Sequence, residues 1–119
     1  MGRHRYEGLE VWKKSVDLAV EISLRTRRYP DFERFSLVTQ TNRAVYSISN
    51  NIAEGAGRGG NGEFKLFLHY SLGSLNEVEN ELLIACRLGY LTVEEYQAFI
   101  DKTAHIKKML IKLIKAIGT

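Results

Sequence analysis

Apolar residues recur every three or four positions along four stretches of this sequence, and no stretch alternates with a period of two for long enough to form a strand. The first stretch covers residues 9–28 and ends ahead of Pro30, because the residue before a proline disfavours the helical region. The other three cover residues 36–58, 62–88 and 93–117. The pattern predicts four long amphipathic helices.

Residues at the ends of these stretches match the chemistry of helix termini. Ser36 and Asn61 are predicted N-caps, and Gly89 is predicted to end the third helix at the C′ position. Thr92, with Glu95 three residues later, predicts a capping box at the start of the fourth helix. Short connections between long helices favour antiparallel neighbours. The sequence therefore predicts an all-α fold, an antiparallel up-down-up-down four-helix bundle in a single domain over residues 1–119.

Composition narrows the class and the cellular setting. With 45% hydrophobic and 26% charged residues, the chain has the balance of an ordinary globular protein. Cys86 is the only cysteine, so no disulfide can form within the chain, and no apolar run approaches the length of a membrane span. We expect a cytoplasmic protein with no membrane partner.

The glycine cluster from Gly55 to Gly60 matches G-x-G-x-x-G, a pattern that binds dinucleotides when it follows a strand and begins a helix. Here the cluster ends a predicted helix and is not followed by Gly-Lys-Ser/Thr, so neither a dinucleotide fold nor a P-loop is predicted. The favoured interpretation is a helix end and a turn. A weaker phosphate role stays open, because the third helix begins beside Arg58.

Polar residues form a stripe on each of the two central helices. On the second helix they are Gln40, Arg43, Ser47, Asn51, Glu54 and Arg58, and on the third they are Gly73, Ser74, Glu77 and Glu81. Small residues there allow close helix approach, and the carboxylates can meet Arg43 or Asn51. We interpret the stripes as a structural polar network between helices or subunits, with an acid/base or metal site as the disfavoured alternative.

No catalytic residue, cofactor or metal site is predicted. A di-iron centre in a bundle requires Glu-x-x-His on two helices, and neither His69 nor His105 has a glutamate three residues before it. The sequence also lacks the zinc motif His-Glu-x-x-His, and it offers no identifiable Ser-His-Asp arrangement. An enzyme is the weakest functional hypothesis.

One end of the predicted bundle gathers the beginnings of the first and third helices and the ends of the second and fourth. The net charge of the chain is +3, and this end has more bases than acids. The bases, which are the predicted nucleic-acid-binding residues, are Arg3, Arg5, Lys13, Lys14, Arg58, Lys65, Lys108, Lys112 and Lys115. A one-ended positive field suits a phosphate backbone, whereas the alternative is a solvated basic face that aids solubility.

Several apolar residues fall outside the predicted core faces. They are Leu66, Tyr70, Leu83, Ile84, Met109 and Ile111. Contiguous exposed apolar surface usually marks an interface, so self-association is expected, with Leu66 and Ile84 facing a neighbour. In the first helix, the predicted core face comprises Leu9, Trp12, Val16, Ala19 and Val20.

Short motifs in a fixed order resemble one known family. They are Leu9-Glu10-Val11-Trp12, Tyr29-Pro30-Asp31-Phe32-Glu33, Asn51-Ile52-Ala53-Glu54-Gly55, Gly73-Ser74-Leu75-Asn76-Glu77 and Leu88-Gly89-Tyr90-Leu91. Together they resemble the four-helix-bundle proteins named after the 23S rRNA intervening sequence, over nearly the whole chain.

The resemblance implies a small bacterial, non-enzymatic bundle that assembles as a homopentamer. The family is similar to the accessory variability proteins of diversity-generating retroelements, which are basic pentamers that bind nucleic acid and a reverse transcriptase. The residues that carry the family pattern, with an implied role in assembly and packing, are Asn51, Glu54, Gly55, Gly73, Ser74 and Glu77.

Two functional hypotheses remain. The first is a homo-oligomeric accessory protein that binds RNA or DNA through its basic end without reading sequence, with a reverse transcriptase or a ribosomal component as protein partner. The alternative is a protein-interaction scaffold ring with no nucleic-acid role, in which the lysines only aid solubility.

Overall fold

The computed structural model describes residues 6–118, so Arg3 and Arg5 of the predicted basic end lie outside the described residues. This range contains four α-helices and two short 3-10 helices. In chain order they are η1 Tyr6–Gly8, α1 Glu10–Thr26, η2 Asp31–Glu33, α2 Leu37–Ala56, α3 Asn61–Arg87 and α4 Val93–Ala116. The four predicted helices are confirmed, and each end lies within two residues of its predicted position.

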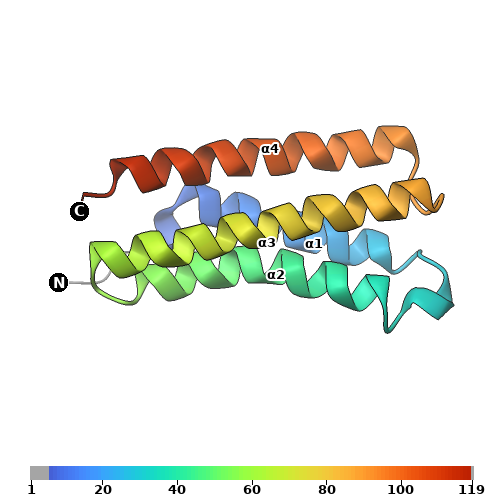
Figure 1. Ribbon diagram of the computed structural model, residues 1–119, viewed down its shortest axis with the longest axis horizontal. Helices are drawn as coiled ribbons and strands as arrows, with labels where there is room; N and C mark the ends of the chain where they lie inside the picture. The colour runs from blue at the N-terminus through green and yellow to red at the C-terminus, as the bar shows by residue number, and fades with distance from the viewer. Residues whose placement is uncertain (1–5, 119) are drawn as a thin grey trace.

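Successive helices run in opposite directions, which confirms the predicted up-down-up-down bundle (Figure 1). α2 packs against α1 and α3, and α4 packs against α3 and α1. The molecule measures 47 × 24 × 19 Å, with its long axis along the helices (Figure 1). The beginning of α1, the α2–α3 turn and the end of α4 therefore lie together at one end of the bundle (Figure 1).

The core is densest between α2 and α3, which make the most extensive contact of any helix pair. Ile52 of α2 and Leu68 of α3 are both fully buried, and burial of each such side chain stabilises the fold by roughly 1.5–3 kcal/mol. Gly55 lets the two helices approach closely, because a Cβ atom there would lie 2.6 Å from Cβ of Phe67. The sequence had placed the small residues that allow close approach on α3, at Gly73 and Ser74, and not at Gly55.

The buried face of α1 differs from the prediction. Val11, Leu18 and Ile22 lie in the core, whereas Val20, which was assigned to the core face, is 54% exposed. α1 carries apolar residues on more than one face, so its periodicity alone does not decide which face packs inward. Contact with α2 and α4 decides which face of α1 is buried.

The predicted caps at the α3–α4 connection are confirmed. Thr92 Oγ1 accepts a hydrogen bond from the Glu95 N–H at 3.0 Å, while Glu95 Oε1 accepts one from the Thr92 N–H at 2.9 Å. Gly89 adopts a φ of 86°, a left-handed conformation that suits glycine. The N–H of Gly89 bonds to Cys86 O and that of Tyr90 bonds to Ala85 O, so α3 ends in a Schellman motif.

Of the other two predicted N-caps, Ser36 is at the N-cap position of α2, whereas Asn61 is not at that of α3. Gly60, and not Asn61, occupies the N-cap position of α3. Ser36 does precede α2, but its ψ of −102° lies outside the extended region of a capping residue, and its side chain makes no cap hydrogen bond. Glu33 Oε1 accepts the Leu37 N–H at 3.4 Å instead.

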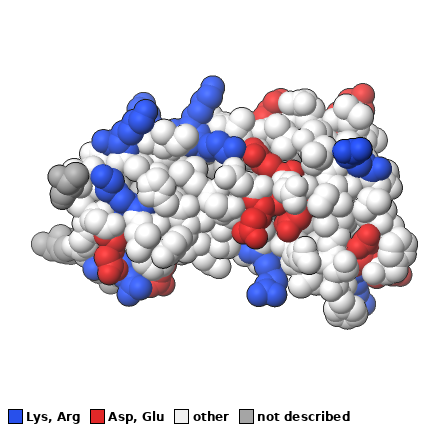
Figure 2. Space-filling model, viewed as in Figure 1, with Lys and Arg blue, Asp and Glu red and all other residues white. Residues whose placement is uncertain are grey.

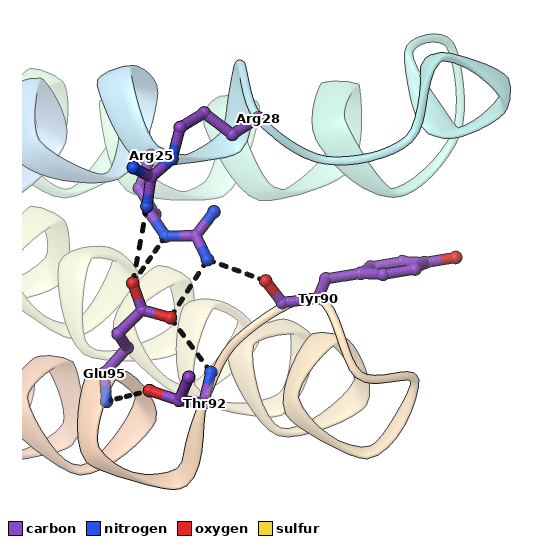
Figure 3. A network of polar contacts seen from close by, with 5 residues as sticks. All are labelled: Arg25, Arg28, Tyr90, Thr92 and Glu95. Carbon is purple, nitrogen blue, oxygen red and sulfur yellow. Dashed lines mark hydrogen bonds and ion pairs between the residues drawn. The ribbon is translucent and has the colours of Figure 1, made fainter.

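α4 is the least buried helix, and polar contacts help to hold it. Of its residues, only Thr103, Ile106 and Leu110 are buried. Glu79 of α3 accepts hydrogen bonds from Thr103 Oγ1 at 2.7 Å and from Lys107 Nζ at 3.0 Å. At the end of the bundle away from the α2–α3 turn, Arg25 reaches from α1 to the α3–α4 connection (Figure 3).

Candidate nucleic-acid interface and assembly face

The predicted basic residues that the structure describes gather at one end of the bundle. Figure 2 shows Lys and Arg side chains over the last part of α4 and the first part of α3, while acidic side chains gather nearer the middle of the same face. We define the basic end by the described residues Lys13, Lys14, Arg58, Lys65, Lys108, Lys112 and Lys115.

Neighbouring carboxylates offset part of the positive charge at the basic end. Arg58 Nε lies 3.3 Å from Glu63 Oε2 and 3.7 Å from Glu54 Oε2. Lys13 Nζ lies 3.6 Å from Glu10 Oε1. Exposed pairs of this kind contribute little stability, but they reduce the field that a phosphate would meet. Arg58 is therefore less available to a phosphate than its position in the sequence suggests.

The lysines at the end of α4 form the least compensated part of the basic end. Lys108, Lys112 and Lys115 are spaced by four and three residues, so they share one face of α4, and all three are exposed. No carboxylate within the described residues pairs with any of them. They also lie in the last turns of α4, where the helix dipole favours positive charge.

The predicted polar network between α2 and α3 forms in part. Ser47 Oγ lies 2.9 Å from Ser74 Oγ, which links the two helices. Asn51 Nδ2 donates to the Oγ and the carbonyl of Ser47, both at 2.9 Å. Asn51 thus bonds within α2, and the expected contact between Asn51 and the α3 carboxylates is not found. Where Ser47 faces Ser74, hydroxyl groups and not ion pairs connect α2 to α3.

Gly73 does not bring helices together within the chain. It is exposed on α3, and a Cβ atom there would meet nothing within 4 Å. The close approach predicted at Gly73 is therefore not found in the single chain.

An open cavity of about 330 Å³ lies between the outer faces of α2 and α3. We call it the α2–α3 cavity; its lining residues are Gln40, Arg43, Ala44, Ser47, Glu77 and Glu81. The Glu81 side chain is about nine-tenths buried, and its Oε1 has no hydrogen-bond partner within the described chain. Burial, and secondly the carboxylate of Glu77, raises the pKa of Glu81. Sequence reasoning placed Glu81 on the polar stripe but did not select it as a site residue.

One face of α3 beside this cavity is partly apolar. Leu66 is 47% exposed and Ile84 is 41% exposed, in agreement with their predicted positions off the core. Their spacing places them on the same face as Tyr70, Gly73 and Glu77. We call these five residues the assembly face. It combines exposed apolar side chains with a glycine and a carboxylate, and exposed contiguous apolar surface often marks an interface.

The structure also exposes apolar residues that sequence reasoning missed. Val20 and Leu24 of α1 are more than half exposed, and Tyr46 of α2 is 44% exposed. A hydrogen bond links α1 to α2 beside these residues, with Ser23 Oγ 3.0 Å from Tyr46 Oη. The sequence did contain a signal for this exposed patch: Val20 and Leu24 are four residues apart, so they lie on one side of a helix that has apolar residues on two faces.

The remaining chemistry of the described residues is limited. They contain no group of three or more His, Cys, Asp or Glu side chains that could hold a metal ion. Across the same residues, no helix combines the length and the apolar character needed to cross a membrane.

The fold and these surfaces define an antiparallel four-helix bundle with a basic end and a partly apolar face on α3. The family model described as 23S rRNA-intervening sequence protein matches residues 7–112. The chain belongs to this family, which confirms the resemblance seen in its motifs.

One solved structure is similar to this chain over most of the length of both proteins. It is a protein with unknown function from the S23 ribosomal protein family of Bacteroides thetaiotaomicron, and it is 31% identical to this chain with a TM-score of 0.80. The match covers 88% of this chain and 98% of that one. A comparison with curated proteins finds no match.

Proposed function

We propose that this protein is a non-enzymatic, cytoplasmic homo-oligomer that binds RNA or DNA through its basic end. The observation that carries the proposal is the exposed row of Lys108, Lys112 and Lys115 on α4, without a carboxylate partner in the described chain. Three ammonium groups on one helix face suit the spaced charges of a phosphate backbone. Contacts to phosphates carry no base information, so binding is independent of sequence.

Assembly strengthens this binding. We take the oligomer to be a homopentamer, as the family resemblance implies, with the assembly face of α3 between subunits. Each copy then contributes one row of lysines, and linked rows bind one strand more tightly than a single row does. The protein partner is a reverse transcriptase or a ribosomal component; the name of the solved relative's family supports the ribosomal choice.

Fluorescence anisotropy with labelled single-stranded and duplex RNA and DNA tests the proposal. The test variant changes Lys108, Lys112 and Lys115 to Gln. The matched control changes three exposed arginines at the opposite end to Gln, so that both variants lose the same charge: Arg27, Arg34 and Arg87. We expect the lysine variant to bind at least tenfold more weakly at 50 mM salt, and the control variant to bind about as well as the parent.

Salt dependence separates phosphate contacts from general attraction. Loss of three phosphate contacts should reduce the slope of log affinity against log salt by roughly two to three. Circular dichroism checks that the variants stay folded. Equal affinity of the lysine variant and the parent would contradict the proposal. In that case, a preserved oligomer would favour the scaffold ring without a nucleic-acid role.

A further inference from the structure

The α2–α3 cavity is rich in hydrogen-bond acceptors. Glu77 and Glu81 contribute two carboxylates, Gln40 an amide oxygen and Ser47 a hydroxyl. Arg43 contributes the one cationic side chain of the lining. The volume of about 330 Å³ falls at the small end of ligand sites, which span about 300–1,000 Å³. The cavity therefore suits a small group that donates hydrogen bonds.

Glu81 is the least satisfied group of the cavity. Its side chain is about nine-tenths buried, yet Oε1 has no hydrogen-bond partner among the described residues. Buried carboxylate oxygens are almost always paired, because an unpaired one loses its hydration without compensation. This oxygen is enclosed, and no group among the described residues donates a hydrogen bond to it.

The character of that donor follows from the surrounding charges. None of the ion pairs among the described residues includes Arg43, Glu77 or Glu81. Two carboxylates against one exposed guanidinium leave the cavity acidic. A metal ion would need more ligands, since no group of three metal-binding side chains exists in the described chain. A planar guanidinium or an ammonium group instead pairs well with carboxylates through several N–H donors.

We propose that the α2–α3 cavity binds a guanidinium or ammonium group, which donates hydrogen bonds to the carboxylates of Glu81 and Glu77, the two acidic residues that line it. The group comes either from a small amine or guanidine, or from a Lys or Arg side chain of a second copy of this chain. Neither source depends on nucleic-acid binding, so a test of this site is independent of a test of the basic end.

Isothermal titration of the full chain with agmatine, which carries both a guanidinium and an ammonium group, tests the small-molecule source. We expect Glu81→Gln to weaken agmatine binding at least tenfold, because it removes the charge-assisted hydrogen bond. Glu77→Gln, at an exposed position, should weaken it less. Glu94→Gln removes the same charge from an exposed position of α4 and should leave binding unchanged. Arg43→Gln removes a competing cation and should tighten binding.

Light scattering tests the second source. If a side chain of another copy fills the cavity, the assembled parent does not bind agmatine, and Glu81→Gln lowers the assembled mass while Glu94→Gln does not. The proposal is overturned if Glu81→Gln changes neither agmatine binding nor mass. It is equally overturned if agmatine binds only after Arg43→Gln, because Arg43 of the same chain would then occupy the cavity.

Discussion

Arg25 and Glu95 form a two-point ion pair that joins α1 to the start of α4. Arg25 Nε and Nη2 lie 3.0 Å from Glu95 Oε2 and Oε1, respectively, and Nη2 also donates to the Tyr90 carbonyl at 2.7 Å. The same carboxylate completes the capping box with Thr92, as Figure 3 shows. Glu95 thus caps α4 and fixes it to α1, while Arg25 also binds the α3–α4 connection at Tyr90. This is the polar anchor of the least buried helix.

This anchor predicts an acid dependence of stability. The hydrogen bonds from Arg25 and from the Thr92 backbone lower the pKa of Glu95 from 4.5 to about 2. Between those values the unfolded chain binds a proton that the folded chain does not. The contribution of Glu95 is therefore complete above pH 4.5 and is lost as the pH falls toward 2. We expect the difference in free energy of unfolding between the parent and Glu95→Gln to shrink over that window.

Urea unfolding at several pH values measures that difference. Glu94→Gln is the matched control, because Glu94 directly precedes Glu95 and makes no ion pair among the described residues; it should change stability little at any pH. A difference between the parent and Glu95→Gln that stays constant from pH 6 to pH 2.5 would show that folding does not lower the pKa of Glu95.

Two glycines of the family pattern should respond to alanine with opposite signs. At Gly55, a Cβ atom would lie 2.6 Å from Cβ of Phe67 and 3.3 Å from the carbonyl oxygen of Phe64. The clash costs about 1–3 kcal/mol, which outweighs the gain of up to about 1 kcal/mol in helix propensity. Gly55→Ala should therefore lower the free energy of unfolding, by up to about 2 kcal/mol.

Gly73→Ala is the matched comparison, because a Cβ atom there would meet nothing within 4 Å among the described residues. The single chain should gain about 0.5–1 kcal/mol from the better helix propensity. Urea unfolding at one fixed, low protein concentration measures both variants, since assembly would add a concentration-dependent contribution. A stabilising Gly55→Ala would contradict the close approach of α2 to α3.

The assembly face predicts a charge-sensitive oligomer. Leu66→Asp or Ile84→Asp should reduce the mass in solution, because association would bury an unpaired carboxylate. Multi-angle light scattering gives the mass directly. Val93→Asp at the start of α4 is the control, because Val93 is 69% exposed and belongs neither to the assembly face nor to the apolar residues expected at an interface. If the two test variants keep the parent mass, the assembly face is not the subunit contact.

Tyr29 predicts a loss of stability at high pH. Its side chain is buried, and its ring centroid lies 5.3 Å from that of Tyr90. Burial raises the pKa of Tyr29 to about 12, although the Arg25 charge opposes the shift. The unfolded chain loses this proton near pH 10, so the contribution of Tyr29 is complete below pH 10 and is lost as the pH rises toward 12.

Thermal melts from pH 9 to pH 11.5 measure this effect. Tyr29→Phe, which cannot ionise, should show a smaller fall in Tm over that range than the parent. Tyr46→Phe, at an exposed position of α2, should behave like the parent. Equal slopes for the parent and Tyr29→Phe would show that the Tyr29 hydroxyl ionises as freely in the folded state as in the unfolded one.

Most of the architecture follows from local chemistry. The four helices, the capping box of Thr92 and the glycine turn at Gly89 depend on residues within one or two turns of each other, so the sequence alone predicts them. The shared location of the lysines on α4 follows as well, because their spacing fixes them on one helix face. The family pattern is also readable directly from the residues.

The sequence by itself therefore determined the helices, their order and the positive end of the bundle. Only the tertiary structure decided which face of α1 is buried and that Arg58 lies beside Glu54 and Glu63. It also decided that Glu81 is enclosed, with one oxygen that has no hydrogen-bond partner in residues 6–118. The physical reason is that these features depend on the rotation and axial offset of one helix against another. Periodicity within a single helix is the same for any such rotation or offset.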